Sequence, residues 1–76
     1  MAEVGERIYF HTKLNRNMIL GGHLFLMTIA RCTGHVVKIK GDHYKVKLEF
    51  PNYDVPVEIW FTAEELKNHA EILVSI

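Results

Sequence analysis

Cysteine is nearly absent from this sequence, since Cys32 is the single one among 76 residues. The chain can form no internal disulfide, so its fold must be held by its core, by oligomerisation or by both. A domain of this length lies near the lower limit for an unassisted core. Cys32 ends an expected strand with no base beside it, which predicts a buried, inert thiol rather than a nucleophile. A lone thiol also fits a reducing compartment.

Long apolar runs are lacking as well. The most apolar stretch, residues 18–30, is interrupted by Gly21, Gly22 and His23. It is shorter than the roughly 20 residues that a helix needs to cross a bilayer. Residues 1–7 are acidic and polar, without the basic start and apolar stretch of a targeting segment. We therefore expect a single cytoplasmic domain over residues 1–76, with no membrane association.

The chain has no excess of either charge, because nine basic residues balance nine acidic ones. The two signs are nevertheless separated. Residues 1–48 contain eight Lys or Arg and three acids, a net charge of +5, whereas residues 49–76 contain one Lys and six acids, a net charge of −5. Either opposite charges meet across strands and cancel, or the first part forms a basic face for an anionic partner.

What the sequence does contain is a period-two alternation of Val, Ile, Tyr and Phe with Lys and Glu, which predicts strands. We expect a long loop over residues 11–22, a break at Thr33-Gly34, a two-residue hairpin turn at Gly41-Asp42 and a turn over residues 51–54. Thr62 followed by Glu65 predicts a capped helical turn that reaches His69. The expected strands cover residues 5–10, 23–32, 35–40, 43–50, 55–61 and, as a last short strand, 71–76.

The two hairpins predict a register whose inward rows are largely apolar, and a slip of one residue would destroy that. The first hairpin pairs Ile39 with Tyr44, Val37 with Val46, and His35 with Leu48. The second pairs Phe50 with Val55, Leu48 with Val57, and Val46 with Ile59.

The same register predicts a basic patch on the outer face of the sheet. Lys38 lies opposite Lys45, a destabilising like-charge pair that a cation–π contact between Lys45 and Trp60 would offset. Lys47 lies between Val36 and Glu58 and pairs with the carboxylate. The patch is either a solvated face with lysine stems over the indole, or a binding face anchored by the tryptophan. As a candidate binding site it consists of Lys38, Lys40, His43, Lys45 and Trp60.

The strand over residues 23–32 is apolar on both faces, whereas a half-buried strand has one polar face. Leu24 and Leu26 lie on one face. Either the loop over residues 11–22 or another copy of the chain must cover the second face. The candidate oligomer interface is the other face, formed by Phe25, Met27 and Ile29.

The order of elements resembles the SH3-like barrels, and the likeness covers most of the chain. Residues 5–10 resemble the G-D-x-V opening of many such domains, and residues 33–48 resemble the central hairpin of KOW-type domains. Residues 57–66 are similar to the closing segment of the type II dihydrofolate reductases, of the small SH3-like protein of photosystem I and of the variable chain of ferredoxin–thioredoxin reductase. The resemblance implies a mostly β fold: a five- to six-stranded antiparallel SH3-like barrel with one short helical turn before the last strand.

No motif in the sequence predicts catalysis, a metal or a cofactor. The five histidines (11, 23, 35, 43 and 69) show no metal-ligand spacing, and the register places His35 and His43 on opposite faces. We expect a non-enzymatic binding or adaptor module that acts through protein–protein contacts, as a homo-oligomer. One alternative is nucleic-acid binding by the Lys/Trp patch, as the KOW resemblance implies. The other is an oligomeric enzyme like the type II reductases, but their V-Q-I-Y segment is Val57-Glu58-Ile59-Trp60 here, with a carboxylate in place of the amide.

Overall fold

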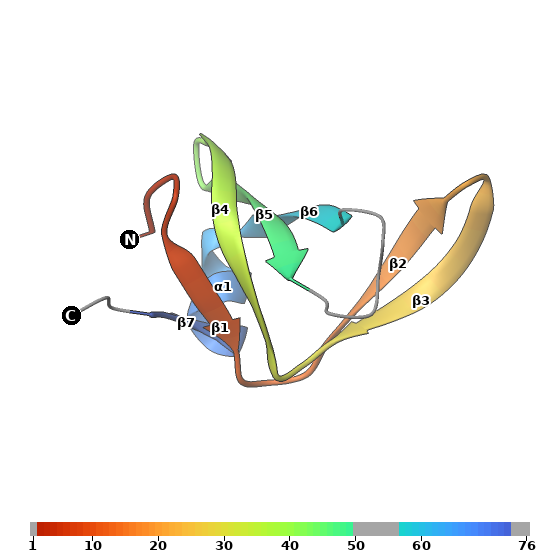
Figure 1. Cartoon of the computed structure of the whole chain (residues 1–76), viewed down its shortest axis with the longest axis horizontal. Coiled ribbons are helices and arrows are strands. Elements are labelled where there is room, and N and C mark those ends of the chain that lie inside the picture. The colour runs from red at the N-terminus through yellow and green to blue at the C-terminus, as the bar shows by residue number, and fades with distance from the viewer. Residues whose placement is uncertain (1, 50–56, 74–76) are drawn as a thin grey trace.

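The computed structural model of the chain describes residues 2–49 and 57–73. Over these residues the chain is mostly β, as expected, with antiparallel pairing throughout. Five strands form one sheet in the order β6-β5-β4-β1-β7, and β2 and β3 form a separate two-stranded sheet (Figure 1). The described strands do not close into a barrel. The elements are β1 (Arg7–Phe10), β2 (Leu14–Leu20), β3 (His23–Ile29), β4 (Cys32–Lys40), β5 (His43–Glu49), β6 (Val57–Thr62), α1 (Ala63–His69) and β7 (Ala70–Ile72).

The prediction of a long loop over residues 11–22 is wrong, because most of this segment is strand β2. This strand pairs with β3, from Leu14 opposite Ile29 to Leu20 opposite His23. Gly21 and Gly22 form the two-residue turn, with φ of 58° and 82°. A tight hairpin turn of this kind requires positive φ at both central positions, and glycine adopts it without steric cost. We call this hairpin, residues 14–29, the arm, because it projects away from the part of the molecule where β1 and β7 lie (Figure 1).

The break between the second and third expected strands is also misplaced. It lies at Ala30 and Arg31 rather than at Thr33-Gly34, and Arg31 has a φ of 52°. Gly34 instead sits inside β4, where a Cβ atom would lie 2.8 Å from the Lys47 carbonyl oxygen. The glycine marks a close approach of β4 to β5, not an end of the strand.

The register between β5 and β6 is confirmed at Val46–Ile59 and Leu48–Val57. The register between β4 and β5 is confirmed only near the Gly41-Asp42 turn, where Ile39 pairs with Tyr44. An irregularity between Val36 and Lys38 shifts the rest by one residue. The predicted pairs Val37–Val46 and His35–Leu48 are therefore wrong, and the pairs in their place are Val36–Val46, His35–Lys47 and Gly34–Leu48. Phe50, Val55 and the turn at 51–54 lie outside the described residues.

The core lies between the five-stranded sheet, α1 and the part of the arm that packs on them, residues 14–17 and 26–29. We call this part the near half of the arm, and we call the five-stranded sheet together with α1 the body. Phe10 and Phe61 meet at its centre with ring centroids 5.1 Å apart. The arm contributes Met27 and Ile29, which alternate with exposed Thr28, so its inner face packs on the core. The remaining buried side chains come from the larger sheet: Ile8, Val36, Tyr44, Val46, Leu48, Val57, Ile59 and Ala70.

The capped helix is confirmed. The Glu65 amide donates to Thr62 Oγ1 at 3.1 Å, and the Thr62 amide donates to Glu65 Oε1 at 2.9 Å. Together these bonds make a capping box for α1. The last strand begins at Ala70, one residue earlier than expected, and residues 74–76 lie outside the described part. In the described part of the chain, no helix is long and apolar enough to cross a membrane.

Candidate functional site

The five residues of the predicted Lys/Trp patch share the outer face of the larger sheet. Lys38 lies opposite Lys45, which lies opposite Trp60, and Lys40 lies opposite His43 in the next row. The neighbours Tyr44, Val46, Ile59 and Phe61 along β5 and β6 are buried, so His43, Lys45 and Trp60 point away from the core. Lys38 and Lys40 lie on the same face, because they pair with Lys45 and His43. The patch is therefore a continuous surface, and the Trp60 side chain in it is 37% exposed.

The charges of the patch are partly neutralised within it. Lys45 Nζ lies 5.9 Å from the centroid of the Trp60 ring and 3.2 Å from Glu58 Oε1. The predicted partner of Glu58, Lys47, is thus replaced by Lys45, a diagonal neighbour across the strands. His43 Nδ1 lies 2.9 Å from Asp42 Oδ1. Among the described residues, no ion pair engages Lys38 or Lys40, which are both exposed.

The shifted register brings His35 onto the outer face of the sheet, where the sequence had not predicted it. His35 lies opposite Lys47 on the outer face, the same face as His43, whereas the predicted register had put the two histidines on opposite faces. Nothing in the local sequence signals this shift, because Val36 and Val37 are adjacent and both apolar, so either of them could face the core. In the described part of the chain, no three His, Cys, Asp or Glu side chains are grouped so that they could hold a metal ion.

The arm carries a second surface, on its outer face. Ile19 and Leu24 lie directly opposite one another, and Leu26 follows Leu24 by two residues on the same face. Their exposed fractions are 71%, 71% and 62%. Large aliphatic side chains exposed to this extent at neighbouring positions typically mark a contact surface.

The predicted oligomer interface of Phe25, Met27 and Ile29 must be corrected accordingly. Met27 is 5% exposed and Ile29 is fully buried, because both pack on the core of their own chain. Only Phe25, at 38%, is accessible among the three. The sequence correctly indicated a strand with two apolar faces, but the more exposed face is the one with Leu24 and Leu26, at 71% and 62%.

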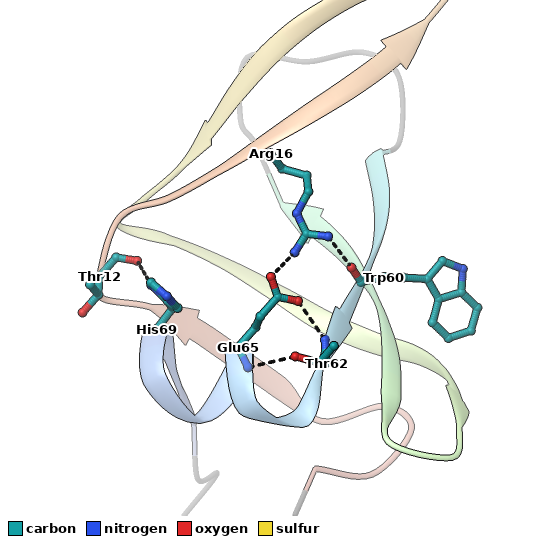
Figure 2. Close-up of polar contacts among 6 residues, drawn as sticks. All are labelled: Thr12, Arg16, Trp60, Thr62, Glu65 and His69. Atoms are coloured by element: carbon teal, nitrogen blue, oxygen red, sulfur yellow. Dashed lines mark hydrogen bonds and ion pairs between the residues drawn. The ribbon is translucent and has the colours of Figure 1, made fainter.

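The near half of the arm is fastened to the body by Arg16, as Figure 2 shows. Its guanidinium donates to Glu65 Oε2 at 2.5 Å and to the Trp60 carbonyl at 3.0 Å. It also lies 5.1 Å from the centroid of the Phe61 ring. The Trp60 indole points away from this cluster (Figure 2). Arg16 therefore holds the strand that presents the tryptophan without contributing its charge to the outer patch.

Two further features lie outside the Lys/Trp patch and the outer face of the arm. Burial raises the pKa of the Cys32 thiol, although a hydrogen bond involving the Ala30 backbone opposes this, so the thiol stays protonated at neutral pH. A pocket of about 540 Å³, partly open to solvent, lies between α1 and the sheet. Its lining is largely apolar and includes Ile8, Tyr44, Leu66, Ala70 and Ile72, with Lys67 and Glu71 as the charged residues.

No protein-family model matches the chain, and no curated protein or solved structure matches it either.

Proposed function

We propose that the protein is a small non-enzymatic binding module that acts through protein–protein contacts and assembles with copies of itself. The observation that carries this proposal is the exposed aliphatic surface of the arm, formed by Ile19, Leu24 and Leu26. These residues lie outside the core that the chain builds for itself. When a partner covers an apolar surface of this kind, its removal from water lowers the free energy of the complex.

The proposed architecture is an open variant of the SH3-like class. The strand order β6-β5-β4-β1-β7, with the arm between β1 and β4 and one helical turn before β7, supports this assignment. The proposed compartment is the cytoplasm, which the single unpaired Cys32 supports.

The expected strength of self-association follows from the size of the surface. Complete burial of a Leu or Ile side chain contributes about 1.5–3 kcal/mol. Two copies that cover three such side chains each, already about one-third shielded, would gain roughly 6–12 kcal/mol. Association costs about 4–15 kcal/mol in lost freedom of motion. Because the two ranges overlap, the net gain is small, and we expect weak self-association that is detected only at high protein concentration.

Light scattering on the wild-type chain at increasing concentration tests the proposal. The expected result is a weight-average molar mass that rises from the 8.8 kDa of one chain to a multiple of it. A molar mass that stays at one chain up to millimolar concentration would refute self-assembly.

A second candidate function is binding of single-stranded nucleic acid by the Lys/Trp patch. The row Lys38–Lys45–Trp60 favours it, because exposed aromatic rings stack on bases while lysines contact phosphates. Titration with an oligonucleotide should then quench the emission of Trp60, and added salt should restore it. Lys38→Glu should weaken the quenching, whereas Lys67→Glu, an equal charge change on α1, should not. If the emission of Trp60 does not change when the oligonucleotide is added at low salt, this function is excluded.

A further inference from the structure

The outer face of the arm carries no charged residue. Its six described positions are defined by the pairing of the two strands, and all six are exposed. The Thr28 hydroxyl donates a hydrogen bond to Asn15 Oδ1 at 2.9 Å across the strands, so part of the hydrogen-bonding capacity of this face is already satisfied. The face consists of Asn15, Asn17, Ile19, Leu24, Leu26 and Thr28.

This composition favours a second copy of the chain over a charged partner. In a twofold arrangement each residue meets the same surface on the other copy, so a charged face would bring like charges together. An uncharged face has no such cost, and its aliphatic side chains can pack on their own counterparts. Charge-selected partners would instead be attracted to the body, where Lys38 and Lys40 are exposed.

The stability of the arm also favours a partner that covers its outer face. An isolated two-stranded hairpin is marginally stable in water. The inner face of the near half of the arm packs on the core through Met27 and Ile29, but Ile19 and Leu24, toward the Gly21-Gly22 turn, remain exposed. Two such hairpins stacked face to face, at about the 10 Å spacing of packed sheets, would bury these side chains in a two-layer sandwich.

We infer that two copies of the chain associate about a twofold axis through the outer faces of their arms, so that Ile19, Leu24 and Leu26 of each copy pack on those of the other. The inference rests on the proposed function, because it names the surface through which the module assembles. The inner face of each arm stays on its own core, with Met27 and Ile29 in place.

Paired substitutions test the surface. Leu24→Thr combined with Leu26→Thr keeps strand propensity, because threonine is favoured in strands, but removes the aliphatic contact. We expect at least a tenfold weaker association than for the wild type, with an unchanged far-ultraviolet circular dichroism spectrum. The control is Val4→Thr, which alters an apolar side chain that is 62% exposed but lies outside the arm. This control should associate like the wild type.

A cross-linking experiment tests the geometry in a Cys32→Ser background. Asn17→Cys places a thiol on the outer face of the arm, opposite Leu26. Facing sheets lie too far apart for a disulfide, so a short bismaleimide is the appropriate reagent. We expect covalent dimers from Asn17→Cys and none from Lys38→Cys, whose thiol lies on the body.

The outcomes separate this inference from the function on which it rests. A wild-type chain that remains a monomer at all concentrations would overturn both. A wild-type chain that associates, with the double threonine variant associating equally well and Asn17→Cys failing to cross-link, would overturn the arm-to-arm interface and leave self-assembly standing.

Discussion

Arg16 of the arm and Glu65 of α1 are 49 residues apart in the chain and meet with 2.5 Å between Nη2 and Oε2. Glu65 also accepts the amide hydrogen of Thr62 through its other oxygen, so one carboxylate both caps the helix and holds the arm. Arg16 adds a hydrogen bond to the Trp60 carbonyl. The arm, the edge strand β6 and the start of the helix are thereby joined at one point.

The first prediction concerns this contact. Arg16→Met removes both charge-assisted hydrogen bonds and should lower the free energy of unfolding by about 1–3 kcal/mol. The matched control is Arg7→Met, because the pair of Arg7 with Glu49 is longer, at 3.4 Å, and its arginine side chain is 57% exposed. That variant should lose less than about 1 kcal/mol. Urea unfolding at neutral pH measures both, and equal losses would show that Arg16 does not anchor the arm.

The second prediction concerns pH. Partial burial by itself would raise the pKa of Glu65, but the hydrogen bond from the Thr62 amide and the charge of Arg16 outweigh it, and the pKa is lowered below the ordinary 4.5. A carboxyl with a depressed pKa in the folded state stabilises above its unfolded pKa, and this contribution is lost as the pH falls through the folded value.

The free energy of unfolding of the wild type should therefore decrease below about pH 4.5, and Glu65→Gln should reduce this decrease. Glutamine can still fill the capping position, so the helix is retained. Glu64→Gln, with the same change of charge in the same turn, is the control and should keep the wild-type slope. Urea unfolding at several pH values between 3 and 7 gives the three slopes. If Glu65→Gln and the wild type have the same slope, the carboxylate does not stabilise the fold.

The third prediction concerns Gly34. A Cβ atom there would lie 2.8 Å from both the Lys47 carbonyl oxygen and Val46 Cγ1, so β4 and β5 would have to separate. Gly34→Ala should cost about 1–3 kcal/mol, the usual range for overpacking. Gly41→Ala is the comparison, because nothing lies within 4 Å and only its φ of +61° is unfavourable. We expect about 1 kcal/mol there. A Gly34→Ala variant as stable as the wild type would contradict the close approach.

The fourth prediction concerns the like-charge pair across β4 and β5. Lys38 lies opposite Lys45, so Lys38→Glu converts repulsion into attraction and should raise the free energy of unfolding by about 0.2–1 kcal/mol. Lys40→Glu, opposite His43 rather than a lysine, should change stability less at neutral pH. Thermal unfolding at low salt is the measurement, and a lower melting temperature for Lys38→Glu would show that the two lysines do not repel one another.

Local signals were enough to predict much of the body. The Gly41-Asp42 turn, the Thr62–Glu65 capping box and the pairing of β5 with β6 each depend on residues close in sequence, and all are confirmed. The Lys/Trp patch followed from that pairing together with the pairing of β4 with β5 next to the Gly41-Asp42 turn. The irregularity between Val36 and Lys38 could not be predicted, because it lets Gly34 and Val36 face the core through a close contact that only the folded sheet defines.

Strand β2 was missed for a different reason. Its inward row contains Arg16, and a charged residue among apolar ones argues against a strand that packs on a core. The partner that makes this arginine acceptable, Glu65, is distant in sequence. Without β2, the turn at Gly21-Gly22 had no hairpin to close. The apolar outer face of β3 therefore could not be separated from its buried inner face.

Sedimentation equilibrium of the wild type beside the Leu24→Thr, Leu26→Thr double variant tests self-assembly through the arm most directly. We expect the wild type to shift toward twice the 8.8 kDa of one chain as its concentration rises, while the variant stays at one chain. A wild type that remains a single chain, or a variant that assembles as strongly as the wild type, would contradict it.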